Sequence, residues 1–231
     1  MFKPCVIVCN PKDVIYPLFM WRINRDRDLF NRVIVVMTQT GSSRDYTDYI
    51  KKNIRNVTIV TNYRDDGKDW RNAAINEGLY EVRSDRVLFL EQDFLVSDGF
   101  FQSLFKQAEP YTTVGLRDGN RFHPACLLTT MVALARTNKD FSVDKDKGDH
   151  FSKVTKDLEK IDNWASLKNF DLPKWEHISG LTQNYRLTKN FHQPKRFYDY
   201  LMESLEYNQP DDWRLFTIKK ANEVKLCLKN S

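Results

Sequence analysis

The chain has 231 residues, of which 41% are hydrophobic and 29% charged, and its formal net charge is +5. This balance excludes a disordered chain and a bundle of membrane helices, and it provides enough apolar residues for one sizeable α/β domain. The modest positive charge favours acidic partners such as phosphates, nucleotides or nucleic acid.

Neither the N-terminus nor the cysteines indicate export or a membrane. The apolar run in MFKPCVIVCNPKD is too short for a signal peptide and lacks a cleavage pattern. No segment approaches the roughly 18 consecutive apolar residues of a membrane-spanning helix. The scattered cysteines favour buried free thiols in a reducing compartment over a zinc site: Cys5, Cys9, Cys126 and Cys227. We expect a cytoplasmic protein, in the host cytoplasm if the source is viral.

The first half of the chain alternates between predicted strands and predicted helices. Apolar and β-branched runs predict strands at residues 3–9, 32–37, 57–60 and 86–90. Helical spacing and capping residues predict helices at residues 14–26, 42–54, 69–83 and 97–105. Repeated β-α-β units with nearly continuous apolar strands predict a mostly parallel, Rossmann-like sheet flanked by helices.

The pattern changes after Pro110. Residues 111–116 and 125–135 resemble strands, residues 138–148 form a polar loop, and residues 149–161 have helical spacing. The last third holds a basic and aromatic stretch at residues 185–198, which suits phosphate contact and base stacking or an ordinary amphipathic helix. We expect one domain over residues 1–231, with a C-terminal helical elaboration.

Polar residues follow the end of each of the four predicted parallel strands. Ligands of such sheets bind beyond the carboxyl ends of the strands, so these residues are expected to line one edge. They are Asn10, Thr38–Gly41, Thr61–Asp65 and Glu91–Asp93.

The acidic pair in VLFLEQDFLV is the candidate metal site. Glu91 and Asp93 share a face in extended backbone, and their hard oxygen atoms suit Mg²⁺ or Mn²⁺. Alternatively, they are solvated acids at a strand end that pair with Arg86 or Arg117.

The segment DWRNAAINEGLYEVRSDRVLFLEQDFLV, residues 69–96, resembles the GT-A glycosyltransferases, in particular the family-2-like group. In that group a helix begins with an Arg-Asn pair, matched here by Arg71 and Asn72. The next strand ends in an Asp-x-Asp motif, where this chain has Glu91-Gln92-Asp93. The resemblance covers residues 1–105 in organisation, but it is specific only in the quoted segment.

The resemblance implies a metal-dependent glycosyltransferase that moves a sugar from a nucleotide-sugar to an acceptor hydroxyl. Residues 1–109 would bind the nucleotide-sugar and residues 110–231 the acceptor. Asp93 would be the direct Mn²⁺ or Mg²⁺ ligand, while Glu91 would hold the metal, the ribose or a metal-bound water. His177 would complete the metal shell, as a C-terminal His does in some relatives, although lone histidines are often structural.

The donor would contact several further positions. Arg71 and Lys68 suit contacts with the diphosphate. A cation in the first turn of a helix interacts unfavourably with the helix dipole, so a functional reason for these two residues is favoured. In the family an acid after the second strand contacts the base, but this chain has Thr38-Gln39-Thr40 there. The contact would therefore come from Thr38, or from Asp65 or Asp66. The candidate donor-binding residues are Asn10, Pro11, Thr38, Asp65, Lys68, Arg71 and Glu91.

An inverting transfer needs a base that takes the proton from the acceptor hydroxyl. Asp149 stands where the family places this acid, with Asp146 and Glu176 as competitors. The ordinary alternative for Asp149 is a helix N-cap.

The acceptor is the least defined part of the hypothesis. A short, basic chain without a membrane span resembles phage-encoded enzymes that glycosylate hydroxymethylated DNA bases, which makes DNA the favoured acceptor. A cell-surface glycan or another small acceptor is the rival, and a non-catalytic nucleotide or nucleic-acid binding module is the alternative of another class. A nucleotidyltransferase would need a Gly-rich basic loop after the first strand, which residues 10–13 do not supply.

Overall fold

The computed structural model describes residues 1–10, 23–38, 50–52, 54–62, 70–91, 94–118, 121–142, 151–161 and 163–177. The expected C-terminal helical elaboration and most of the helices predicted at residues 14–26 and 42–54 lie outside these ranges, although residues 23–25 and 50–52 are helical.

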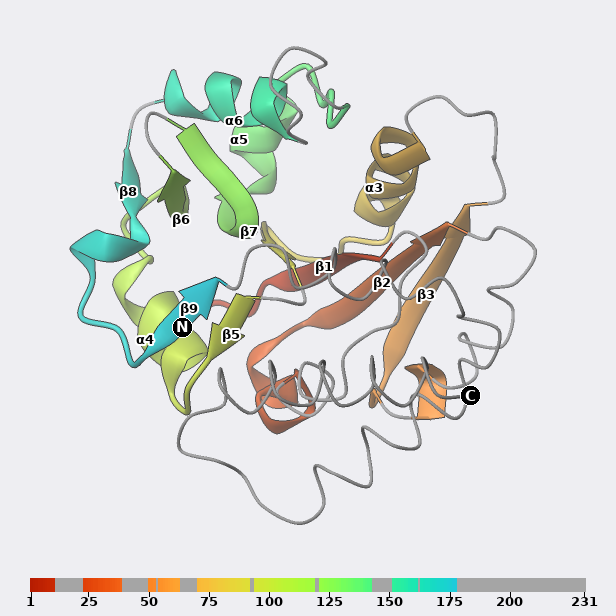
Figure 1. The fold of residues 1–231 in the computed structure, drawn as a ribbon, viewed down its shortest axis with the longest axis horizontal. Coiled ribbons are helices and arrows are strands. Elements are labelled where there is room, and N and C mark those ends of the chain that lie inside the picture. The colour runs from red at the N-terminus through yellow and green to blue at the C-terminus, as the bar shows by residue number, and fades with distance from the viewer. Residues whose placement is uncertain are drawn as a thin grey trace, which may run out of the picture.

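A mixed sheet in the order β3-β2-β1-β4-β7-β6-β8 organises the described chain (Figure 1). Strands β1 to β4 run parallel to one another, β7 runs antiparallel to β4 and β6, and β8 runs parallel to β6. The prediction of an α/β, mostly parallel sheet is confirmed. The strands are β1 Cys5–Asn10, β2 Arg32–Thr38, β3 Val57–Asn62, β4 Arg86–Leu90, β6 Thr113–Asp118, β7 Arg121–Thr130 and β8 Trp164–Ser166.

The carboxyl ends of the first four strands meet at one edge of the sheet. In the ladder Asn10 pairs with Met37, and Thr38 pairs with Asn62. In β4, Phe89 pairs with Ile7 of β1, and Leu90, the last residue of β4, pairs with Val8. Of the positions expected to line this edge, the structure describes the backbone of Asn10, Thr38, Thr61, Asn62 and Glu91, and these lie at it.

Helices cover both faces of the sheet (Figure 1). On one side α3, α5 and α6 pack over a core that includes Phe89, and on the other side α4 packs over Leu88 and Leu90. Alternate residues of β4 thus enter different cores, as its two-sided burial requires. The helices are α3 Trp70–Tyr80, α4 Phe100–Gln107, α5 Met131–Ala135 and α6 Ser152–Glu159, with 3-10 turns η1 Arg27–Leu29 and η2 Leu167–Asn169.

Helix α4 has the buried face that its spacing predicts. Phe100, Phe101, Leu104 and Phe105 are all buried. The rings of Phe30 and Phe100 each pack edge-to-face on Phe101, with centroid separations of 5.2 and 5.3 Å. This aromatic layer fixes the segment that follows Glu91.

The prediction of a strand at residues 125–135 is wrong for its second half, which forms α5. The strand ends at Thr130, whose hydroxyl accepts a hydrogen bond from the N–H of Ala133 at 3.0 Å. This N-cap stabilises a helical turn at a position where β-branched and apolar composition favoured a strand.

A second, two-stranded sheet was not predicted. It joins β5 Phe94–Val96 to β9 Trp175–His177 in antiparallel fashion, with Phe94 opposite His177. The rings of Phe94 and Trp175 stack at 5.6 Å. This pairing brings the chain near residue 177 beside the carboxyl end of β4.

Two of the expected buried thiols lie in described positions. Cys5 and Cys126 are buried and free, and burial raises the pKa of the Cys126 thiol. None of the helices in the described ranges is long and apolar enough to cross a membrane.

Gly78 is the contact point of α3 with β2, and its replacement tests this packing. A Cβ at Gly78 would lie 2.7 Å from Cγ2 of buried Val36. We expect Gly78→Ala to lower the free energy of unfolding by about 1–2 kcal/mol, because the overlap outweighs the gain in helix propensity. Urea titration measures this.

Tyr80→Ala is the control on the same helix, because Tyr80 is 78% exposed. Its effect should stay within about 0.5 kcal/mol. Equal stability of Gly78→Ala and the native chain would contradict the close packing of α3 on the sheet.

Candidate functional site

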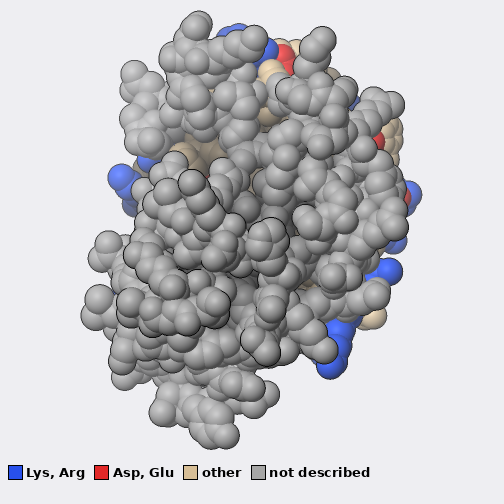
Figure 2. Space-filling view, turned by 45° about the vertical axis from the view of Figure 1, so that its right-hand side comes forward, with Lys and Arg blue, Asp and Glu red and all other residues tan. Residues whose placement is uncertain are grey.

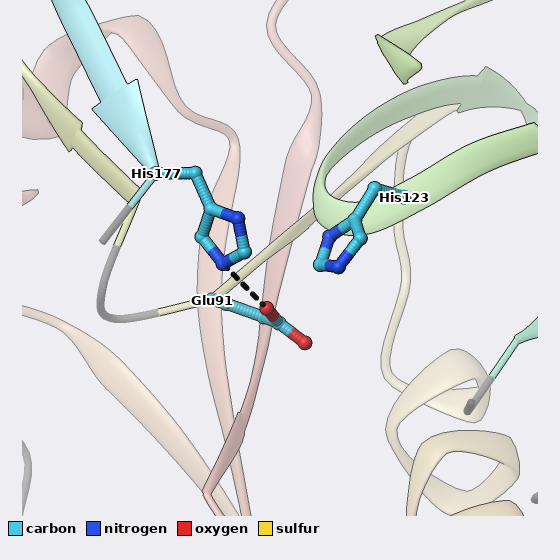
Figure 3. A group of neighbouring side chains, drawn as sticks. All are labelled: Glu91, His123 and His177. Carbon is cyan, nitrogen blue, oxygen red and sulfur yellow. Dashed lines mark ion pairs between the residues drawn. The ribbon is translucent and has the colours of Figure 1, made fainter. Parts of the chain in front are cut away.

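Three side chains converge beyond the carboxyl end of β4: Glu91, His123 and His177 (Figure 3). One nitrogen or oxygen atom from each lies within 4.8 Å of the others. Nε2 of His177 lies 3.6 Å from Oε2 of Glu91. Each residue comes from a different element, so the cluster is a product of the tertiary fold.

Glu91 is held by its backbone on both sides. Its N–H donates to the carbonyl oxygen of Ala125 at 3.0 Å, and its own carbonyl accepts from the N–H of Phe94 at 3.1 Å. The first bond extends the pairing of β4 with β7, and the second closes the turn into β5. The carboxylate is 36% exposed and so remains accessible from solvent.

His177 is the last residue of β9. Its position depends on the pairing of Phe94 with His177, because β5 begins directly after the turn that contains Glu91. The side chain is 16% exposed, which leaves its ring largely enclosed by the fold.

His123 reaches the site because the β6–β7 hairpin contains a bulge. The register jumps from Gly115 opposite Leu127 to Leu116 opposite His123. Pro124 lies in the bulge and has no N–H to give to the ladder. Such a bulge redirects the side chains beside it.

Gly115 permits the close approach of the strands at this bulge. A Cβ there would lie 2.9 Å from the Phe122 ring and 3.2 Å from the carbonyl oxygen of Cys126. Opposite it, the N–H of Ala125 donates to Nδ1 of His123 at 3.1 Å, which fixes the orientation of the ring. The rings of His123 and His177 then lie 4.6 Å apart.

A carboxylate with neighbouring imidazoles is a donor set for a divalent cation. Two ligands of one ion, each about 2.1 Å from it, lie roughly 3 to 4 Å apart. The 3.6 Å between Glu91 and His177 falls in that interval. The pair therefore has the atom types and the spacing to bind such an ion.

The expected pairing of Glu91 with Arg86 or Arg117 is not the arrangement found. Arg86 donates to the carbonyls of Ala108 and Glu109, at 3.1 and 2.9 Å, and burial lowers the pKa of its guanidinium. Arg117 lies 3.5 Å from Glu159 and 4.5 Å above the Trp164 ring. Among the residues the structure describes, the ion pair of Glu91 is with His177.

The backbone places three further candidates at the same edge or beside it. Asn10 ends β1, Thr38 ends β2, and Arg71 lies in the first turn of α3, but their side chains are outside the description. Their contacts with a donor stay predictions. The candidates Pro11, Asp65, Lys68, Asp93 and Asp149 lie wholly outside the described residues.

The Asn of the Arg-Asn pair has a structural role. Oδ1 of Asn72 accepts hydrogen bonds from the N–H of Phe141 at 2.9 Å and from Nδ2 of Asn76 at 3.0 Å. It thereby ties the start of α3 to the chain that precedes residues 143–150.

Both ends of the segment 143–150, which contains Asp149, lie against β4. The rings of Phe141 and Phe151 are 4.9 Å apart and lie 5.7 and 5.1 Å from the Phe89 ring. Phe89 is two residues before Glu91, and Phe151 is two residues after Asp149.

A salt bridge joins Asp140 and Lys153, which lie on either side of this segment in the chain. Nζ of Lys153 donates to Oδ2 of Asp140 at 2.6 Å and to the hydroxyl of Ser142 at 3.1 Å. The Lys153 ammonium and Ser142 hold the pKa of the Asp140 carboxyl below its usual range.

His123 carries no strong signal in the sequence. Its neighbours in the chain have no metal-ligand spacing, and only the bulge directs it to Glu91. The nearest signal in the sequence is Pro124, which marks an interruption in an otherwise apolar strand.

Comparisons with known proteins identify the fold. No protein-family model matches the sequence, and no curated protein sequence matches it significantly. Among solved structures, a fragment of S. aureus TarS gives a TM-score of 0.54 at 11% identity, over 86% of this chain and 68% of that one. The mannosyltransferase PcManGT from Pyrobaculum calidifontis, in complex with GDP-Man and Mn²⁺, gives 0.53 at 15% identity, over 96% and 70%. These likenesses show a fold of the GT-A type.

Replacing Asp140 tests its salt bridge with Lys153. Since the folded-state pKa of Asp140 is lowered, its stabilising contribution is present above the unfolded value of about 3.9 and is lost as the pH falls through the folded value. We expect Asp140→Asn to lower Tm at pH 7, with the difference from the native chain shrinking from about pH 4 downward. Thermal unfolding across this pH range measures the effect.

The matched control is Asp171→Asn, because Asp171 is exposed and its hydrogen bonds with Gln107 use its backbone N–H and carbonyl. A constant difference between Asp140→Asn and the native chain at all pH values would show that the carboxylate charge of Asp140 is not what stabilises the fold here.

Proposed function

We propose that this chain is a metal-dependent glycosyltransferase that moves a sugar from a nucleotide-sugar donor to an acceptor hydroxyl. The observation that carries the proposal is the 3.6 Å approach of Glu91 and His177 beyond β4 in a sheet of the GT-A type. It supports the prediction, made from the resemblance at residues 69–96, that the acidic segment and a distant His belong to one site.

A divalent ion such as Mn²⁺ fits the donor set at Glu91 and His177. When bound, it would stabilise the negative charge of a departing diphosphate as a Lewis acid. The mannosyltransferase that resembles this chain in fold was solved with GDP-Man and Mn²⁺, which supports this choice of ion and donor class. Asp93, two residues after Glu91, is the proposed further ligand.

The remaining roles belong to residues of the same edge. Arg71, in the first turn of α3, and Lys68 would bind the diphosphate, where a helix N-terminus also favours anions. Asn10, Pro11, Thr38 and Asp65 would contact the nucleoside. These positions follow strand ends that the parallel register brings to one edge.

Asp149 is the proposed base. The acceptor oxygen would attack the anomeric carbon and lose its proton to the Asp149 carboxylate, while the bond between that carbon and the diphosphate oxygen breaks. The diphosphate leaves with the electron pair of that bond. This choice is supported by the contact between Phe151, two residues after Asp149 in the chain, and Phe89, two residues before Glu91.

For the acceptor we propose a hydroxymethylated base of DNA, which would have to be flipped out of the duplex. The support is the net charge of +5, which favours a polyanion. Figure 2 shows described Lys and Arg side chains at several separate places around the rim of one face. The basic and aromatic stretch at residues 185–198 lies outside the described residues.

A donor screen tests the function. The protein is incubated with common nucleotide-sugars and Mn²⁺ or Mg²⁺, with and without hydroxymethylated duplex DNA, and release of nucleoside diphosphate is measured. We expect metal-dependent release that increases when the DNA is present.

The outcomes separate the alternatives. Release that ignores DNA would favour a glycan or small acceptor. Binding of a nucleotide without release in any combination would favour a non-catalytic binding module. Neither binding nor release would contradict the glycosyltransferase proposal as a whole.

Glu91→Gln tests the metal site itself, because it removes the charge and retains the shape of the side chain. We expect Mn²⁺ affinity to fall at least roughly tenfold, about 1.4 kcal/mol, in calorimetric titration. His177→Ala should have a similar effect, and Asp93→Ala should abolish metal-dependent turnover.

Glu109→Gln is the control for the loss of one carboxylate, because Glu109 is exposed at the end of α4, away from the cluster. It should leave Mn²⁺ affinity unchanged. Equal affinities for Glu91→Gln and Glu109→Gln would place the ion elsewhere, provided that both variants keep the native circular dichroism spectrum.

A further inference from the structure

We infer that His123 is a sugar-binding residue, which donates a hydrogen bond from Nε2 to a hydroxyl of the transferred sugar and does not bind the metal. This inference rests on the proposed function, and it assigns different roles to the two histidines of the cluster.

A backbone hydrogen bond determines which nitrogen of the His123 ring carries the proton. The N–H of Ala125 donates to Nδ1 of His123 at 3.1 Å, so the lone pair of Nδ1 is engaged and Nδ1 carries no proton. In a neutral imidazole the proton then lies on Nε2. His123 therefore presents a donor to its surroundings at Nε2.

This proton position conflicts with metal binding. A metal at Nε2 needs the lone pair there, and the proton would have to move to Nδ1. Two N–H groups, those of Nδ1 and Ala125, would then point at each other. A metal at Nδ1 would displace the Ala125 N–H instead. Either way a hydrogen bond inside the bulge is lost.

The backbone of Ala125 is hydrogen-bonded on both sides of its Cα atom. Its carbonyl accepts the N–H of Glu91 at 3.0 Å, so the same residue holds the end of β4 and the ring of His123. Gly115 and Pro124 fix the bulge around it. His123 is thus oriented by the same backbone that orients Glu91.

His123 lies on the opposite side of β4 from the candidate nucleoside-binding residues. The nucleoside-binding candidates follow β1, β2 and β3, which lie on one side of β4, whereas His123 belongs to β7 on the other side. The diphosphate joins nucleoside and sugar, and it would lie at the metal beside Glu91. A sugar extending beyond it reaches the β7 side, where His123 meets Glu91 and His177 (Figure 3).

A hydrogen bond from His123 would distinguish the nucleotide-sugar from the nucleoside diphosphate. A sugar hydroxyl accepts a hydrogen bond from a ring N–H, and a single neutral bond of this kind changes affinity roughly threefold to tenfold. The nucleoside diphosphate alone lacks the sugar. Its affinity should therefore not depend on His123.

Binding measurements with two matched variants test the assignment. Asn places an acceptor near the position of Nδ1 but no donor near Nε2, whereas Gln extends far enough to place an N–H near Nε2. Titration calorimetry measures affinity for Mn²⁺, and in saturating Mn²⁺ for GDP-mannose against GDP and UDP-glucose against UDP.

We expect His123→Asn to weaken binding of the preferred nucleotide-sugar roughly threefold to tenfold, and His123→Gln to restore most of it. Affinities for Mn²⁺ and for the nucleoside diphosphate should change less than about twofold in both variants, which is small beside that effect. Equal losses for the sugar donor, the diphosphate and Mn²⁺ would identify His123 as a metal ligand. No change in any affinity would also overturn the inference.

A spectroscopic measurement decides the proton position without turnover. Long-range ¹H–¹⁵N correlation spectra of imidazole-labelled protein report which ring nitrogen is protonated, and the chain has only 4 histidines to assign. For His123 we expect protonated Nε2 and unprotonated Nδ1, both before and after addition of diamagnetic Mg²⁺. A proton on Nδ1, or a ring response that marks ligation, would contradict the assignment.

Failure of the inference and failure of the proposed function differ in the native protein. If the native chain binds Mn²⁺ and a nucleotide-sugar but His123→Asn loses the metal, only the role of His123 is overturned. If the native chain binds no nucleotide-sugar and no nucleoside diphosphate, the proposed function and this inference fall together.

Discussion

The backbone of Ala125, on both sides of its Cα atom, makes the contacts on which the cluster depends. Its carbonyl accepts the N–H of Glu91 and its N–H donates to His123, so one residue in a bulge sets two of the three side chains. The third, His177, depends on the pairing of β5 with β9, which begins just after the turn at Glu91. Backbone hydrogen bonds, rather than contacts among the side chains themselves, therefore define the site. A cation site built this way is preorganised, because its ligands are held by the sheet before any ion arrives.

Local patterns of the sequence were sufficient for the parallel half of the fold. The run RVLFL has no polar residue after its first, and β4 occupies residues 86–90 as expected, with its last four residues buried. The spacing of Phe100, Phe101, Leu104 and Phe105 likewise predicted the buried face of α4. Such signals are readable because the apolar residues of each element are adjacent or regularly spaced within that element. The acid at the strand end could be identified for the same reason, since a carboxylate after a buried strand is a local feature.

The rest of the site depends on contacts between distant residues. His177 meets Glu91 through a two-stranded sheet whose partners are about 80 positions apart, as Phe94 and His177 are. His123 requires a register shift that depends on the room left by Gly115, a residue whose role is visible only when Phe122 and Leu127 are packed against it. The helix α5 was misassigned because one hydroxyl, that of Thr130, outweighs the strand preference of its neighbours. None of these effects has a fixed spacing in the sequence.

The central claim is that Glu91 and His177 hold a divalent ion against the diphosphate of a nucleotide-sugar. The most direct measurement is a crystal structure of the protein soaked with Mn²⁺ and a nucleoside diphosphate, with data collected at the manganese absorption edge. The claim predicts an anomalous peak about 2.1 Å from both a Glu91 oxygen and Nε2 of His177, in contact with the diphosphate. A manganese peak bound to the diphosphate but remote from both side chains would contradict it.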